Sequence, residues 1–291
     1  GEGEAFLASD VPAFLDHTRK AVFLEDGEMA VLRREQISFF KLSGQKVEKK
    51  VHTITWDRAM AEKAGFRHFM LKEIHDQPQT VADTLSGRLF PLKPGALEQE
   101  TGMSASALSQ VSRVTLLACG TAYHAGLIGK YLIESLAGVP AEAETASEFR
   151  YRGPIIDPKG LAVAISQSGE TADTLSAVKL AKQAGSKVLA VCNCVGSALT
   201  READYNLYTH CGPEFGVAST KAFVGQLTAL SVFALHLGLA TGKLTEARAR
   251  AYVDELVRLP GLIRTVLGLD AKVLELAKHF LKTRDFLYIG R

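Results

Sequence analysis

Short apolar runs and helical periodicities alternate along the chain from about residue 99 onwards. The runs are mostly uninterrupted, which is typical of strands buried on both faces of a parallel sheet. Between them, apolar residues recur three to four positions apart, as in helices. Strands are expected at residues 114–118, 139–145, 161–165, 188–192 and 205–209, and the main helices at residues 123–136, 171–184 and 218–239. The pattern therefore predicts an α/β fold: a doubly wound parallel five-stranded sheet flanked by helices.

The first fifth of the chain has a different pattern, with short β-type runs separated by turn residues. The runs lie at residues 21–24, 29–33, 37–42 and 47–54. Gly27 and Gly44 supply the glycines that tight hairpin turns require. Because a few short strands can hardly bury a core of their own, we expect residues 1–57 to be the C-terminal remnant of a larger β-rich domain.

Two further segments flank the α/β part, which we place at residues 99–243. Residues 58–98 form a connector that is helical up to about residue 86, with Pro78 expected to break or restart the helix. Residues 244–291 are expected to contain two amphipathic helices, at 246–259 and 261–281, and then a strand at 286–289.

The composition is that of an ordinary globular protein. Of the 291 residues 47% are hydrophobic and 23% are charged, and the net charge of +2 comes from 34 basic and 32 acidic residues scattered along the chain. Nothing in this distribution indicates a nucleic-acid partner. No uninterrupted apolar run reaches the roughly 18 to 20 residues needed to cross a membrane, and the first residues lack the features of a signal peptide. We therefore expect a cytoplasmic protein.

Four cysteines are too few for a disulfide scaffold in a chain of this size, so we expect reduced thiols. Cys192 and Cys194 are close in sequence, but no second pair follows at the spacing of a zinc site. We expect no metal and no cofactor.

Candidate chemistry lies in the loops that follow two of the predicted strands, because ligands of open parallel sheets bind at the carboxyl ends of the strands. Residues 119–122 form the first loop. Residues 166–171 form the second, with three hydroxyls, a glycine and a helix start. Backbone N–H groups at a helix N-terminus, together with hydroxyls, bind phosphate without a lysine. A simple helix cap with a capping-box arrangement explains the same residues.

Nucleotide-binding motifs are missing at this position. Neither a Gly-Lys-Ser/Thr loop nor the Gly-x-Gly-x-x-Gly spacing occurs there, so a small phosphorylated ligand is expected. Residues 216–221 form a third element at the start of the long helix, where Lys221 is a candidate anion contact and capping by Ser219 and Thr220 is the alternative.

Four separated stretches resemble a known family: 117–121 (LACGT), 146–152 (ASEFRYR), 166–174 (SQSGETADT) and 216–223 (GVASTKAF). They are similar to the first sugar isomerase (SIS) domain of the isomerising glutamine–fructose-6-phosphate aminotransferases, the glucosamine-6-phosphate synthases. Upstream, residues 68–74 (HFMLKEI) and 77–78 resemble the linker between the two halves of that family, and the preceding strands resemble the end of its glutaminase domain.

The resemblance implies a ligand and a set of contacts. Its members make glucosamine 6-phosphate from fructose 6-phosphate and glutamine, so either sugar phosphate is the implied partner, and SIS domains usually pair, which implies a homodimer. The implied substrate-binding residues are Thr121, Ala122, Ser166, Gln167, Ser168, Thr171, Val217 and Ser219. At the position of Ala122 the family usually has a serine. The histidines at 124, 210 and 236 are interpreted as structural.

The same resemblance implies that catalytic groups lie elsewhere. The family's glutaminase nucleophile is an N-terminal cysteine, whereas the first cysteine here is Cys119. The family's isomerase residues belong to a second SIS domain, of which residues 286–291 resemble the first strand. We therefore expect a fragment that binds the sugar phosphate without turnover and holds no catalytic residue. The alternatives are a non-catalytic sugar-phosphate-sensing SIS module and a free-standing phosphosugar isomerase.

Overall fold

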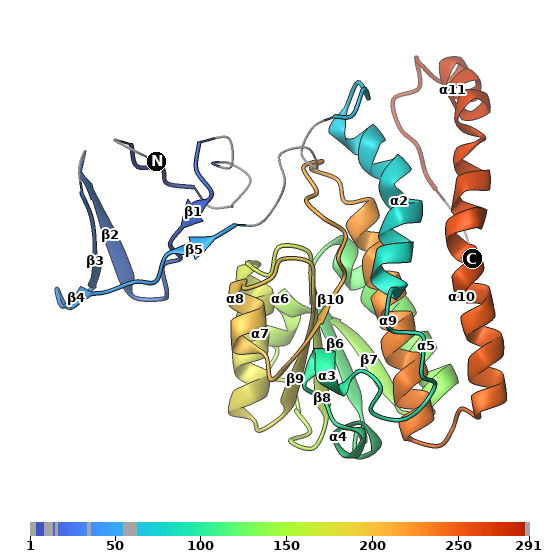
Figure 1. Cartoon of the computed structure of the whole chain (residues 1–291), viewed down its shortest axis with the longest axis horizontal. Coiled ribbons are helices and arrows are strands. Elements are labelled where there is room, and N and C mark those ends of the chain that lie inside the picture. The colour runs from blue at the N-terminus through green and yellow to red at the C-terminus, as the bar shows by residue number, and fades with distance from the viewer. Residues whose placement is uncertain (1–3, 9–13, 15–16, 34–35, 55–62, 289–291) are drawn as a thin grey trace. The chain divides into compact units, whose positions relative to one another are not determined.

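The structure is a computed structural model of the whole chain and describes residues 4–8, 14, 17–33, 36–54 and 63–288. The chain divides into two compact units, Gly1–Arg67 and His68–Arg291 (Figure 1). The expected boundary at residues 57 and 58 lies outside the described residues.

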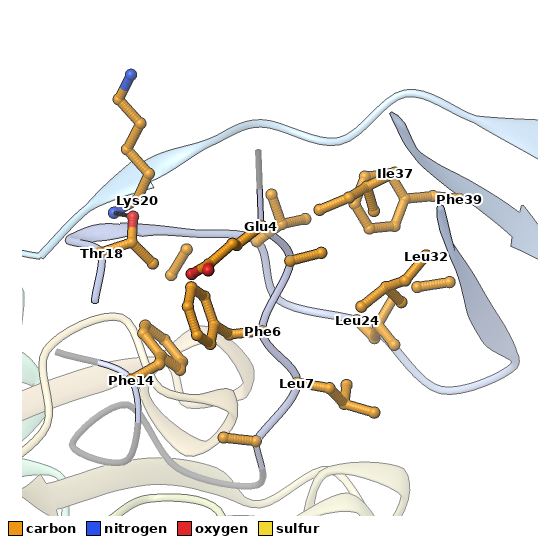
Figure 2. A pocket seen from close by; sticks show the side chains of 15 residues that line it. Glu4, Phe6, Leu7, Phe14, Thr18, Lys20, Leu24, Leu32, Ile37 and Phe39 are labelled. Carbon is orange, nitrogen blue, oxygen red and sulfur yellow. Dashed lines mark hydrogen bonds between the residues drawn. The ribbon is translucent and has the colours of Figure 1, made fainter. Parts of the chain in front are cut away.

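The first unit contains two small antiparallel sheets. Strands β2 (Glu28–Arg33), β3 (Gln36–Lys41) and β4 (Lys46–Val47) form one, in that order, and β1 (Lys20–Ala21) pairs with β5 (His52–Thr53) in the other. The predicted run at 47–54 is thus divided between β4 and β5. Figure 2 shows an apolar pocket of about 140 Å³ in this unit, with Phe6, Leu24 and Phe39 among its lining residues. Among the described apolar residues of the unit, only Ala21 is buried, so these strands enclose little core.

The second unit contains the predicted parallel sheet. Its strands are β6 (Val114–Ala118), β7 (Ala141–Thr145), β8 (Leu161–Ser166), β9 (Lys187–Cys192) and β10 (Tyr205–Tyr208), in the order β10-β9-β8-β6-β7. All four pairings are parallel. The strand order therefore reverses direction between β6 and β8, which is the switch point of a doubly wound sheet.

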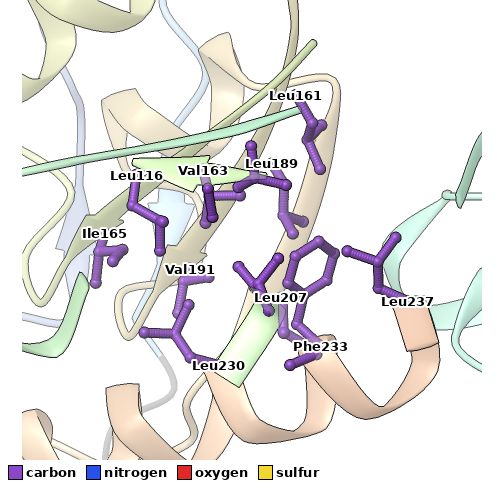
Figure 3. Packing of buried hydrophobic residues seen from close by; sticks show 14 of the residues in the cluster. Leu116, Leu161, Val163, Ile165, Leu189, Val191, Leu207, Leu230, Phe233 and Leu237 are labelled. Atoms are coloured by element: carbon purple, nitrogen blue, oxygen red, sulfur yellow. The ribbon is translucent and has the colours of Figure 1, made fainter. Parts of the chain in front are cut away.

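Both faces of this sheet are covered by helices, which explains the uninterrupted apolar runs. Val163 and Ile165 of β8 face the cluster shared with α5 (Thr121–Ala137) and α9 (Lys221–Ala240), shown in Figure 3. Ala162 and Ala164 of the same strand face the cluster on the opposite side. That side is covered by α6 (Ala146–Tyr151), α7 (Ala172–Gln183) and α8 (Ala198–Glu202).

The remaining helices lie outside these two layers or lead into them. Helix α2 (Phe69–Leu85) and helix α10 (Glu246–Leu267) share a third apolar cluster with α9, and the three lie side by side in Figure 1. Two short helices, α3 (Glu98–Thr101) and α4 (Ala105–Ser109), precede β6, and α11 (Asp270–His279) follows α10.

Three predictions about element boundaries are wrong. Helix α2 continues through Pro78, with Val81 beyond the proline packed in the third cluster. Helix α10 likewise continues through Pro260, because Leu256 and Ile263, on either side of it, pack against the same cluster. In both helices tertiary packing outweighs the lost backbone hydrogen bond.

The third wrong prediction is the strand at 286–289. Residues 286–288 are not in a strand, and Ile289 lies outside the described residues. Phe286 instead packs its ring edge-on against Phe280, with the ring centroids 5.6 Å apart. A β-strand requires a hydrogen-bonded neighbour, and no described strand pairs with this run.

Candidate functional site

The carboxyl ends of β6 and β8, which are neighbours in the sheet, open into a cavity of about 210 Å³. All eight residues predicted to bind a sugar phosphate line this one cavity. The full lining consists of Cys119, Thr121, Ala122, Ile165, Ser166, Gln167, Ser168, Thr171, Thr174, Glu214, Gly216, Val217, Ser219 and Gln226. The cavity thus lies at the switch point, where doubly wound sheets bind their ligands.

The loop after β8 brings its hydroxyls together. The Gly169 N–H donates to Ser166 Oγ at 3.0 Å, and the Glu170 N–H donates to Ser168 Oγ at 3.2 Å. Ser166 Oγ also lies 3.4 Å from Thr171 Oγ1. These bonds fold the loop back on itself, so that three hydroxyls gather at the start of α7.

The loop does not form the capping box that was its alternative interpretation. Thr171 is the N-cap residue of α7, but its side chain makes no capping hydrogen bond. The Glu170 carboxylate points to another helix, because its Oε1 accepts the N–H of Ala198 at the start of α8 at 2.8 Å. The N-terminus of α7 therefore keeps backbone donors that its own side chains do not occupy.

The backbone conformation at Gly169 and the residues packed around it require a glycine. Its φ of +71° is in the left-handed region, where residues with a side chain are strained. A Cβ at this position would lie 2.0 Å from Ser197 Oγ and 2.9 Å from Cys192 Sγ. The packing of the surrounding residues is therefore by itself a sufficient reason for a glycine here.

Among the residues that the structure describes, Glu214 is the only charged side chain in the cavity lining. Its Oε1 accepts the N–H groups of Thr220 and Ala222, at 2.8 and 3.1 Å, and its Oε2 accepts the hydroxyl of Ser219 at 3.0 Å. Glu214 thus caps α9 and occupies the positive end of that helix dipole. An anion in this cavity is favoured near the N-termini of α5 and α7, away from this carboxylate.

Lys221, a candidate anion contact, does not line the cavity. It is buried, and its ammonium lies 3.2 Å from Asp76 Oδ2 on α2. The prediction that it contacts an anion is therefore wrong. No lysine or arginine is among the described residues that line the cavity, so backbone donors and hydroxyls are the groups there that favour an anion.

Sequence reasoning missed two carboxylates that shape the third loop. Glu214 precedes the start of α9 by only seven residues, so a search for capping acids upstream of the helix would have found it. Glu73, on α2, accepts the N–H of Phe215 at 2.6 Å and that of Gly216 at 3.2 Å. Because 142 residues separate Glu73 from Phe215, no local signal predicts this contact.

The three histidines interpreted as structural, His124, His210 and His236, do not line the cavity. Burial lowers the pKa of His210 and of His236, which favours the neutral form of each ring. The His236 ring nitrogen Nε2 lies 2.8 Å from the carbonyl oxygen of Arg88, and His124 is exposed on α5.

Two observations concern metal binding and membrane insertion. In the part of the chain that the structure describes, no group of three or more His, Cys, Asp or Glu side chains could hold a metal ion. Helix α9 is long and apolar enough to cross a membrane by length and composition, although 72% of its most apolar window is buried within the unit. Polar residues such as Gln226 and His236 interrupt its apolar sequence, and its burial is that of a core helix.

The fold and the cavity define a doubly wound α/β domain with a polar cavity at its switch point, and residues 107–236 match the family described as SIS domain. Over all of its 291 residues the chain is 47% identical to "Glutamine--fructose-6-phosphate aminotransferase [isomerizing]" from Symbiobacterium thermophilum, of which it covers 48%. It is likewise 47% identical to the protein of that name from Thermococcus kodakarensis, covering 47% of it. The chain is therefore a relative of the isomerising glutamine–fructose-6-phosphate aminotransferases, as the sequence resemblance predicted, and spans about half their length.

A solved structure agrees with this relationship. The C-terminal domain of glucosamine-fructose-6-phosphate aminotransferase from Francisella tularensis superposes with a TM-score of 0.72 at 37% sequence identity. The match covers 75% of this chain and 61% of that one.

Proposed function

We propose that the SIS domain of this chain binds fructose 6-phosphate or glucosamine 6-phosphate in the cavity at the switch point. The single observation that carries the proposal is that the eight predicted residues, which come from three loops far apart in the sequence, line one cavity. The phosphate lies at the Ser166, Ser168 and Thr171 hydroxyls and the N-termini of α5 and α7, where helix dipoles favour a dianion. The sugar extends towards Val217 and Ser219.

We further propose that this domain belongs to an enzyme that makes glucosamine 6-phosphate from fructose 6-phosphate and glutamine. The 47% identity over the whole chain supports this. Residues 1–57 then correspond to the end of a glutaminase domain, 58–98 to the linker, 99–243 to the first SIS domain and 244–291 to the connection into a second. The enzyme is cytoplasmic and homodimeric, and it binds neither nucleic acid nor membrane.

The 291 residues on their own bind the sugar phosphate without converting it. The described part of the cavity lining supplies no histidine or lysine, the side chains that most often move protons or form imines with sugars. Adding fructose 6-phosphate and glutamine to the chain is therefore expected to yield no glucosamine 6-phosphate, and detectable product would contradict this part of the proposal.

Binding is tested by calorimetric titration of the chain with fructose 6-phosphate. Saturable binding is expected, and Ser168→Ala should weaken it about 10-fold or more, since a hydrogen bond to a charged group contributes about 1.5–3 kcal/mol. Ser176→Ala is the matched control, because the Ser176 hydroxyl lies on α7 and donates to the Ala172 carbonyl. A folded protein that binds neither sugar phosphate would overturn the proposal.

A further inference from the structure

Gln226 is a buried polar residue at the cavity that no predicted contact explains. It lies in the second turn of α9, its side chain lines the cavity, and the residue is only 3% exposed. Its side-chain oxygen Oε1 is buried and has no hydrogen-bond partner among the residues that the structure describes. An unpaired buried acceptor is unfavourable, and a partner from outside the chain would remove this cost.

Asn206 Oδ1, Thr220 Oγ1 and His236 Nδ1 are also buried without a partner among the described residues, but none of these three residues lines the cavity. On the same helix as Gln226, the buried hydroxyls of Thr228 and Ser231 donate to the carbonyls of Val224 and Leu227, at 2.8 and 2.9 Å. In the cavity, Glu214 already accepts three donors. The unpaired acceptor therefore belongs to a residue at the ligand cavity, whereas the hydroxyls elsewhere on α9 are paired within the helix.

We propose that Gln226 is a specificity-determining residue that binds a hydroxyl of the sugar. The proposal rests on the proposed function and extends it. An acceptor needs a donor, and a dianionic phosphate has none to offer, whereas each sugar hydroxyl does. Gln226 therefore contacts the carbohydrate part of the ligand, and the loop at residues 166–171 holds the phosphate.

The test compares two ligands on one variant. Gln226→Met keeps an unbranched side chain of similar length and removes the unpaired polar group. Its affinity for fructose 6-phosphate is expected to fall about 3- to 10-fold, the range of one neutral hydrogen bond. Its affinity for inorganic phosphate, which has no sugar hydroxyl, should stay at the wild-type value. Its melting temperature without ligand should stay unchanged or rise, because an unpaired buried acceptor has been removed.

Two controls keep the outcome unambiguous. Thr228→Val alters a buried side chain on the same helix away from the cavity and should leave both affinities unchanged. If Gln226→Met does not fold, Gln226→Leu is measured in its place. An unchanged affinity for fructose 6-phosphate would overturn the role of Gln226, as would a parallel loss for both ligands together with a lower melting temperature. Wild-type protein that binds no fructose 6-phosphate would instead overturn the proposed function itself.

Discussion

The carboxylate of Glu73 accepts the backbone N–H of Gly216 at 3.2 Å from each of its oxygens. The same carboxylate accepts the N–H of Phe215, and the residue is only 1% exposed. These bonds connect α2 to the loop that carries Val217 and Ser219 into the cavity. A carboxylate is stable at such a buried position only if donors of this kind replace its water.

Glu73→Gln is expected to lower the free energy of unfolding by about 1–3 kcal/mol, because the amide nitrogen would face backbone donors and leave one of them unpaired. Equilibrium unfolding in urea measures this change. Glu255→Gln is the control: Glu255 makes an exposed ion pair with Arg258, and its loss should cost at most about 0.5 kcal/mol. Equal stabilities of the two variants would contradict the assigned role of Glu73.

Gly169→Ala tests why the phosphate loop requires a glycine. Gly169 and Gly153 have similar φ values of +71° and +65°, but a Cβ meets nothing within 4 Å at Gly153. Gly153→Ala should therefore cost only the backbone strain of about 1–2 kcal/mol. Gly169→Ala adds the clash with Ser197 and should cost about 1–3 kcal/mol more.

The two alanine variants should also differ in ligand affinity. In Gly169→Ala the loop must move away from Ser197, so fructose 6-phosphate binding should weaken, whereas Gly153→Ala should bind as the wild type does. Titration of both variants measures this difference. Equal unfolding free energies and equal affinities would show that the clash with Ser197 is relieved without moving the loop.

The strands of the sheet could be predicted from the sequence, because a parallel strand covered on both faces is an uninterrupted apolar run. Such a run is visible without knowledge of the tertiary structure. Val114–Ala118 was predicted to the residue, and the starts of the other four strands fall within two residues of the structure. The loops after these strands follow from the same signal, which is why Ser166 and Thr171 could be assigned to one site.

Contacts between distant segments could not be predicted. Glu73 and Gly216 lie 143 residues apart, and no periodicity connects them. Gln226 looks like an ordinary polar residue on a core helix until the cavity is known. The helix boundaries predicted at Pro78 and Pro260 were wrong. Local helix propensity is weaker than the tertiary packing of the segments before and after each proline.

Ala122→Ser is expected to strengthen fructose 6-phosphate binding by about 3- to 10-fold, because it adds a hydroxyl donor to the cavity lining at the start of α5. Calorimetric titration measures the gain. Ala125→Ser, one turn further along the helix and fully buried away from the cavity, should lower stability without improving binding. A loss of affinity in Ala122→Ser would show that the cavity has no room for the hydroxyl.

The reactivity of the four cysteine thiols tests the cavity without any substitution in the chain. Burial raises the pKa of Cys211 to about 12, and burial also raises the pKa of Cys192. At pH 8 only about one Cys211 side chain in 10⁴ is therefore the reactive thiolate. Cys119 and Cys194 are partly exposed, so a disulfide reagent such as DTNB should titrate these two thiols in the native protein and all four in urea.

Fructose 6-phosphate should slow the reaction of Cys119 and leave that of Cys194 unchanged, because only Cys119 lines the cavity. Cys119→Ser should accordingly retain a single fast thiol whose rate is independent of the ligand. Cys211 should stay unreactive from pH 7 to pH 9, because its pKa of about 12 lies well above this range. Rapid labelling of Cys211 in this range would mean that its burial is lost in solution, and protection of Cys194 by the ligand would place the sugar phosphate outside the proposed cavity.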